Sequence, residues 1–152
     1  MVDVTSTILI ERPPADVSAY ACDPANAPAW YANIRSVDWE TAPPLVIGTR
    51  IAFVATFLGR TLRYTYVVRD LVIGLRLVMS TEQGPFPMET TYTFAAHDAG
   101  TQMTLRNRGR PSGFSRPLAP FVAAAMGRAN RKDLARLKAV LEGNCGHGTT
   151  RM

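Results

Sequence analysis

Residues 117–141 form one long amphipathic stretch, and this stretch limits the folds that are open to the chain. Apolar side chains recur along its first half at i, i+3 and i+4, which is the spacing of one face of an α-helix. These side chains are Leu118, Phe121, Val122, Ala125, Met126 and Ala129. The basic residues Arg128, Arg131 and Lys138 lie off this face. A lone helix of this length needs an apolar surface to cover it, and we expect a curved sheet to supply that surface.

The apolar face of this helix changes direction near its middle. From Leu134 onward, Leu137, Val140 and Leu141 continue the stripe roughly a quarter turn away. We therefore expect the first half to border a space and the second half to anchor the helix, with the junction at residues 127–131.

The chain before this helix is typical of antiparallel β-structure. Short alternating segments separated by turn residues predict strands near 4–10, 36–40, 49–58, 60–69, 75–80, 88–94 and 102–108. A proline-broken region with two short helices separates the first two strands. Strands joined by tight turns pair consecutively, so we predict an α+β fold in which a curved seven-stranded antiparallel sheet wraps around the long C-terminal helix.

Alternation assigns one face of each strand to the interior. The expected inward-facing residues are Leu62, Tyr64, Tyr66, Val68, Leu75, Leu77, Met79, Met88, Thr90, Tyr92, Phe94, Met103, Leu105 and Asn107. The tyrosines either hydrogen-bond a ligand or reach a rim where their hydroxyls meet water. The methionines either adapt to a ligand or simply fill gaps in the core.

Length and composition predict one globular domain. The 152 residues are 47% hydrophobic and 19% charged, as in a soluble protein, and no apolar run approaches the ~20 residues needed to cross a bilayer. The first residues lack the basic and apolar segments of a secretion signal, so we expect a cytoplasmic protein. We assign residues 1–142 to the domain and the Gly-rich residues 143–152 to a flexible tail.

The positive charge is concentrated near the C-terminus. Residues 1–105 carry 7 Lys and Arg against 10 Asp and Glu, whereas residues 106–152 carry 10 against 2. Such a region is either a solvated helix face or a surface that docks on an acidic partner or on anionic lipid. We expect no nucleic-acid binding, because the short helices near residues 14–34 lack the basic residues that grip phosphates.

Several short motifs occur in a specific order along the chain. They are Ile8 with residues 13–17, Asp23-Pro24 with Trp30, Gly48-Thr49-Arg50 before the third strand, and Gly100-Thr101 before the last strand. With the order of elements, these motifs resemble those of the START-like (SRPBCC) superfamily, which includes Bet v 1-like, polyketide cyclase/dehydrase-like and lipid-carrier proteins. The resemblance covers residues 3 to about 142. It implies a helix-grip fold with a cavity for an apolar or amphipathic molecule.

The residue types predict no metal site and no cofactor. His97 lies in a turn, and Cys145 and His147 lie in the predicted tail, so a closed coordination shell is not expected. Residues 109–113 lack the lysine of a phosphate-binding loop. The carboxylates that we considered as acid/base pairs fall at strand ends, in turns or on the outward face. These are Asp70, Glu82, Glu89 and Asp98.

We therefore expect the chain to bind a hydrophobic or aromatic small molecule, lipid-like or polyketide-like, as a carrier or sensor. The expected ligand-binding residues are Phe53, Phe57, Tyr64, Tyr66, Met79, Met88, Thr90, Tyr92, Met103, Leu105, Phe121, Val122, Ala125 and Met126. Polar tips on these apolar bodies can hydrogen-bond carbonyl or hydroxyl groups.

Two alternatives remain open at this point. As the resemblance implies, the chain can be a polyketide cyclase/dehydrase-like enzyme that positions its substrate, with Tyr64, Tyr66, Tyr92 and Asn107 as candidate catalytic residues. It can also be an interaction module that docks through the basic face of its C-terminal helix, with peripheral contact to anionic lipid. The patterns allow either a monomer or a homodimer.

Overall fold

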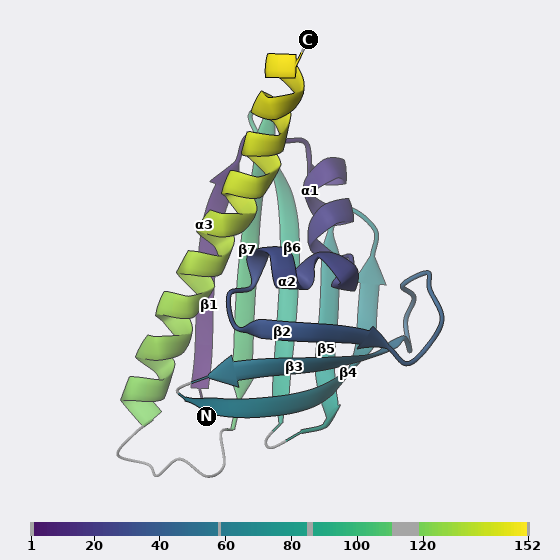
Figure 1. The fold of residues 1–152 in the computed structure, drawn as a ribbon, viewed down its shortest axis with the longest axis vertical. Coiled ribbons are helices and arrows are strands. Elements are labelled where there is room, and N and C mark those ends of the chain that lie inside the picture. Colours follow the sequence, from purple (N-terminus) through teal and green to yellow (C-terminus); the bar gives the residue numbers. More distant parts are fainter. Residues whose placement is uncertain (1, 58, 85–86, 111–118, 152) are drawn as a thin grey trace.

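Seven antiparallel strands form one sheet that bends around the long C-terminal helix (Figure 1). The structure is a computed structural model, and it describes residues 2–57, 59–84, 87–110 and 119–151, with most of their side chains. The strands are β1 Val2–Ile10, β2 Ile34–Trp39, β3 Arg50–Phe57, β4 Arg60–Val72, β5 Arg76–Gln83, β6 Met88–His97 and β7 Gly100–Gly109.

The strand order is β1-β7-β6-β5-β4-β3-β2. Strands β2 to β7 pair consecutively, as the tight turns predict, and β1 closes the other edge by pairing with β7 from Val2 opposite Gly109 to Ile10 opposite Thr101. The register shifts twice where β4 pairs with β5, and such bulges bend a strand. The α+β helix-grip prediction with a seven-stranded sheet is confirmed.

Three short helical segments connect β1 to β2: α1 Pro14–Ala21, η1 Pro24–Asn26 and α2 Ala27–Trp30. Proline stands at the first turn of each, where its missing N–H costs nothing. Asp23 Oδ1 accepts a hydrogen bond from the Ala25 backbone N–H at 3.0 Å. The fully buried Trp30 ring lies 4.1 Å from the Tyr31 ring and 5.7 Å from the Tyr92 ring, between centroids. These contacts fix the segment against the sheet.

The long helix, α3, spans Ala119–Arg151 and packs mainly along β1 (Figure 1). Its second half enters the main core, where Leu134, Leu137 and Leu141 are buried together with residues of the sheet. Leu118, which was expected on its apolar face, lies outside the described residues. The helix continues over most of residues 143–152, where a tail was expected. The flexibility of that stretch stays a prediction.

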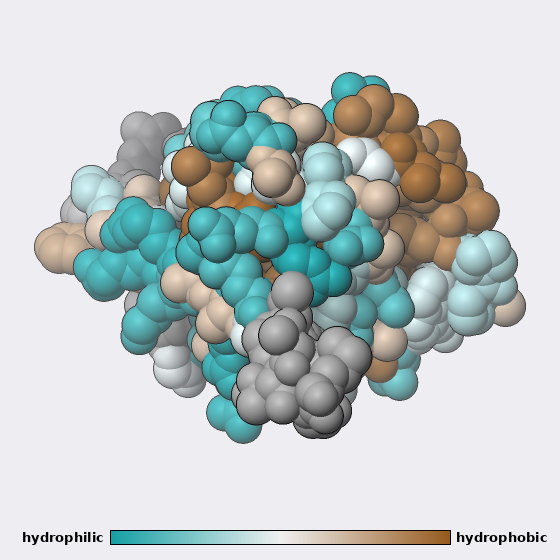
Figure 2. All heavy atoms as spheres, turned by 90° about the horizontal axis from the view of Figure 1, so that it is seen from above, coloured by the Kyte–Doolittle hydropathy of each residue, from teal (hydrophilic) through white to brown (hydrophobic). Residues whose placement is uncertain are grey.

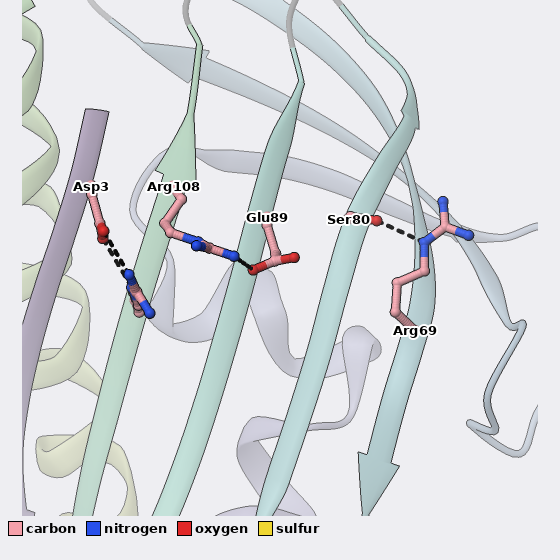
Figure 3. A network of polar contacts seen from close by, with 6 residues as sticks. Asp3, Arg69, Ser80, Glu89 and Arg108 are labelled. Carbon is pink, nitrogen blue, oxygen red and sulfur yellow. Dashed lines mark hydrogen bonds and ion pairs between the residues drawn. The ribbon is translucent and has the colours of Figure 1, made fainter. Parts of the chain in front are cut away.

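The outer face of the sheet carries a row of polar contacts across β1, β7, β6, β5 and β4 (Figure 3). Asp3 accepts two hydrogen bonds from Arg106, at 2.9 and 2.6 Å, which lowers the pKa of its carboxyl. Glu89 pairs with Arg108, and Arg69 Nε donates to Ser80 Oγ at 2.7 Å. Exposed pairs of this kind contribute little to stability, so we interpret the outer face of the sheet as a solvated surface.

One inward assignment on the sheet is wrong. Leu75 is 57% exposed, because β5 begins only at Arg76 and Leu75 belongs to the turn that contains Gly74, whose φ is +82°. The neighbouring Ile73 is 89% exposed. Viewed from above, apolar side chains gather on one side of this end of the molecule, while hydrophilic side chains cover much of the rest (Figure 2). Among the described residues, no helix has the length and apolar character needed to cross a membrane.

Candidate functional site

A cavity of about 160 Å³ lies between the sheet and the first half of α3. Its apolar lining comes from Ile34, Phe53, Ala55, Leu62, Met79, Met88, Val122, Met126 and Ala129. Its polar lining comes from Tyr31, Asn33, Thr56, Tyr64, Tyr66, Thr90, Tyr92, Asn107, Asn130 and Asp133. The strands supply most of the wall because alternation turns every second side chain inward. The first half of α3 forms the facing wall.

Most of the predicted site residues meet in this cavity. Those that line it are Phe53, Tyr64, Tyr66, Met79, Met88, Thr90, Tyr92, Asn107, Val122 and Met126. The side chain of Phe57 lies outside what the structure describes. The change of face predicted for the helix is also present, since Val122 and Met126 border the cavity while Leu137 lies in the main core.

Four predicted site residues lie elsewhere. Met103 and Leu105 point inward but are fully buried in the main core, because the anchoring half of α3 covers that part of β7. Phe121 is 70% exposed, and Ala125 is half-buried outside the lining. Successive helical residues are rotated by about 100°, so the face that carries Val122 and Met126 turns these two neighbours away from the cavity.

Two tyrosines are joined inside the cavity. The hydroxyls of Tyr31 and Tyr92 are 2.6 Å apart and share a hydrogen bond. Burial raises the pKa of both phenols, and burial raises the pKa of Tyr66 to about 12. These groups are therefore neutral at physiological pH. With Tyr92 only 4% exposed and its hydroxyl bonded to Tyr31, the alternative of a tyrosine at a wet rim is wrong for Tyr92.

A chain of buried hydrogen bonds links the sheet to α3. Thr90 Oγ1 donates to Asn107 Oδ1 at 2.6 Å, and Asn107 Nδ2 donates to Asn130 Oδ1 at 3.0 Å. Thr90 and Asn107 lie opposite each other on β6 and β7, so the pairing of the strands holds them in place. Polar networks of this kind position side chains well because each buried group needs its partner.

The sequence analysis missed a buried acid. Asp133 is 3% exposed and lines the cavity, and burial raises the pKa of its carboxyl to about 6, against the lowering effect of a hydrogen bond from the Ala32 backbone N–H. No buried acid or base was evident from the sequence, and Asp133 is one. Asp133 stands between Lys132 and Leu134, next to the basic face, and a charged residue in such a position is usually solvated. Its helical spacing was a usable signal, because Asp133 follows Asn130 by three residues and Met126 by seven and therefore lies on the same face of the helix.

The carboxylates that were considered from the sequence do lie on the surface. Asp70 pairs with Arg76 at 2.8 Å, and Glu82 pairs with Arg50 at 2.6 Å. The basic face of α3 is likewise directed to solvent, with Arg128 and Lys132 exposed. Its proposed docking on acidic partners stays a prediction.

The chain was compared with known proteins. A family profile described as "Polyketide cyclase / dehydrase and lipid transport" matches residues 1–142. No relative was found among curated proteins. Many solved structures share the fold. Three of them are TTHA0849 from Thermus thermophilus (22% identity, TM-score 0.79, 90% of this chain and 94% of that chain), a START superfamily protein from Mycobacterium smegmatis (13%, 0.76, 93% and 97%) and the Zhui aromatase/cyclase from a Streptomyces species, strain R1128 (18%, 0.76, 92% and 93%). At these identities the likeness establishes the fold alone.

Proposed function

Because the chain belongs to the polyketide cyclase/dehydrase and lipid transport family, we propose that it binds a small, mainly apolar molecule in the cavity between the sheet and α3, as a carrier or sensor. The observation that carries this proposal is the cavity itself, whose lining is mainly apolar with hydrogen-bonding groups concentrated where β6 and β7 face α3. Ligand sites in proteins commonly combine an apolar lining with a few well-placed polar groups.

The volume bounds the size of the ligand. An apolar cavity of about 150 Å³ holds one benzene ring, so the 160 Å³ here suits a group of about that size. A longer lipid-like or polyketide-like molecule needs further space. The unbranched side chains of Met79, Met88 and Met126 can supply part of it by changing rotamers.

A substitution that fills the cavity tests this proposal. Ala129 lines the cavity, whereas Ala135 is exposed on the same helix, so Ala129→Phe and Ala135→Phe are a matched pair. Native mass spectrometry of protein purified from its own host should show a small-molecule adduct on the wild type and on Ala135→Phe, and none on Ala129→Phe. The proposal fails if the wild type reproducibly carries no adduct, or if the adduct persists on Ala129→Phe.

A second candidate function is a cyclase or dehydrase reaction, and Asp133 is the observation that favours it. A carboxyl whose pKa is about 6 exists in both protonation states near neutral pH, which suits a general acid or base. Its charge also raises the pKa of Tyr31 and Tyr92, so the three groups act on one another. In this candidate function Asp133 exchanges a proton with a bound ketone or enol while the apolar walls hold the carbon chain in position.

Enzyme kinetics with a short poly-β-ketone thioester separate the two candidates. If the chain is an enzyme, Asp133→Asn lowers kcat by at least tenfold while KM changes little, and Tyr→Phe changes at 64, 66 or 92 also lower turnover at similar affinity. Ala135→Phe is the control and keeps wild-type turnover. Undetectable turnover in the wild type leaves only the binding function, and turnover that is unchanged in Asp133→Asn excludes Asp133 from the reaction.

A further inference from the structure

One donor nitrogen at the cavity has no partner. Asn130 is 4% exposed and is one of the residues that line the cavity, and its Nδ2, which is itself almost fully covered, makes no hydrogen bond within the described part of the chain. Leaving a buried donor unpaired is costly, which is why such groups are rare in folded proteins. A small rotation of the Asn130 side chain toward the cavity would give this donor a partner from outside the chain.

The neighbouring side chains determine which end of the Asn130 amide is free. Thr90 donates to Asn107, and Asn107 in turn donates to Asn130 Oδ1. These two hydrogen bonds occupy the carbonyl oxygen of Asn130 and leave its amide N–H groups for a ligand, since the orientation of the amide follows from its hydrogen bonds. The pairing of β6 with β7 holds Thr90 and Asn107 in place, so the partner of the Asn130 carbonyl oxygen is fixed before any ligand arrives.

The charges around the donor limit the ligand further. Asp133 follows Asn130 by one helical turn on the same face and also lines the cavity. The described residues that line the cavity include no Lys, Arg or His to balance an anionic group. Burying an unpaired charge is costly, and a carboxylate or phosphate would also meet the Asp133 carboxyl. An uncharged acceptor avoids both costs.

We propose that Asn130 is the specificity-determining residue of the cavity, and that its Nδ2 donates to the acceptor oxygen of an uncharged carbonyl compound, such as a ketone, ester or lactone, with an apolar body about the size of one ring. This inference rests on the proposed binding function, which it narrows to one class of ligand and one recognising residue.

Three probes of similar shape test the inference. Acetophenone carries a carbonyl acceptor, α-methylstyrene replaces the carbonyl oxygen by a methylene group, and benzoate carries a charged acceptor. Their dissociation constants follow from NMR titration of the Met methyl groups, because Met79, Met88 and Met126 line the cavity. The readout is the α-methylstyrene to acetophenone ratio of dissociation constants, compared between proteins, so that the unequal hydration of the two probes cancels.

Two variants remove the donor in different ways. Asn130→Leu replaces the whole amide by an apolar group with the same number of side-chain heavy atoms. Asn130→Asp keeps an oxygen for Asn107 while it removes the N–H groups. If Asn130→Leu does not fold, Asn130→Asp still tests the inference. A neutral hydrogen bond is worth roughly 0.5–1.5 kcal/mol, so the ratio should fall by roughly 3- to 10-fold in both. Gln102→Leu, an amide replaced on the exposed face of β7, should leave it unchanged.

Each outcome decides between the inference and its premise. A fall in the ratio at Asn130 alone, with benzoate binding more weakly than acetophenone, supports the inference. An unchanged ratio in both Asn130 variants, an equal fall in Gln102→Leu, or tighter binding of benzoate overturns it. In those cases, measurable binding of α-methylstyrene still leaves the binding function intact. If none of the three probes binds to the wild type, the binding function fails at this ligand size and the inference fails with it.

Discussion

Asp133 Oδ1 accepts a hydrogen bond from the backbone N–H of Ala32 at 3.1 Å. The contact joins the middle of α3 to the connection between α2 and β2, which are separated by 101 positions in the chain. It places a titratable group at the boundary of the cavity and couples its protonation to the stability of the fold.

We predict that Asp133→Asn gains stability relative to the wild type as the pH rises. The pKa of Asp133 is about 6 in the folded protein against 3.8 for the ordinary group. Between these two pKa values the Asp133 carboxyl is ionised in the unfolded chain but still protonated in the folded one. It therefore lowers the free energy of unfolding as the pH rises from about 4 to 6, and the loss stays constant above pH 6. Asparagine avoids that loss and keeps an oxygen for Ala32. The difference should grow by on the order of 1–2 kcal/mol between pH 4 and pH 7, after allowance for partial solvation.

Urea denaturation at a series of pH values measures this difference. Asp38→Asn, which changes an exposed carboxylate on β2, is the control and should differ from the wild type by less than about 0.5 kcal/mol throughout. Parallel curves for Asp133→Asn and the wild type would show that the Asp133 carboxyl is not destabilised by burial.

The tyrosine pair should show strong coupling. Removing either hydroxyl, by Tyr31→Phe or Tyr92→Phe, breaks the 2.6 Å hydrogen bond and should cost roughly 0.5–1.5 kcal/mol of unfolding free energy. The double variant has no hydroxyl left unpaired, so its cost should be close to that of one single variant. A double-mutant cycle by chemical denaturation measures the coupling, and additive costs would mean that the bond contributes nothing.

Phe121 and Met126 should respond differently to truncation, although the helical pattern suggested one shared face. Met126 is 9% exposed and lines the cavity, whereas Phe121 is 70% exposed. Met126→Ala should lower the free energy of unfolding by roughly 2–3 kcal/mol and weaken the binding of acetophenone. Phe121→Ala should change stability by less than about 0.5 kcal/mol. Thermal unfolding and the NMR titration report both effects, and equal losses would contradict the orientation of α3.

Two glycines should differ in their tolerance of a methyl group. A Cβ at Gly100 would overlap the backbone carbonyl of Ile10, which the β1–β7 pairing holds in place, whereas a Cβ at Gly143 meets nothing within 4 Å. Gly100→Ala should therefore destabilise the protein by roughly 1–3 kcal/mol. Gly143→Ala, on an exposed position of α3, should be neutral or stabilise it by up to about 1 kcal/mol. Melting temperatures compare them, and a harmless Gly100→Ala would argue against this approach of the two backbones.

The strand pattern predicted the sheet half of the cavity well. Thr90, Tyr92 and Asn107 were all placed inward, because a period of two leaves only one alternative face. Leu75 was placed wrongly because alternation alone does not show at which residue a turn ends. The pairing of Tyr31 with Tyr92 was not predictable, since it depends on how the short helices fold back over the sheet.

The helix half was harder to predict from sequence. A helical stripe is continuous around the axis, so a shift of phase of well under half a turn takes Phe121 out of the cavity wall and brings Asn130 into it. Asp133 also lies among basic neighbours, and charge patterning favours a solvated position for such a residue. The packing of α3 against β1 and α2 decides its orientation, and that information is spread over segments distant in the sequence.

The pairing of β1 with β7 has a consequence for the order of folding. Val2 lies opposite Gly109, so the pairing of β1 with β7 closes a loop that contains the other five strands. Pairing of segments so distant in sequence is slow, because the entropy of closing the intervening chain is lost before the contacts form. Strands β2 to β7 can pair through local hairpins, but α3 rests on β1. We therefore expect the wall that carries Asn130 and Asp133 to dock in the last step of folding, with the cavity absent until then.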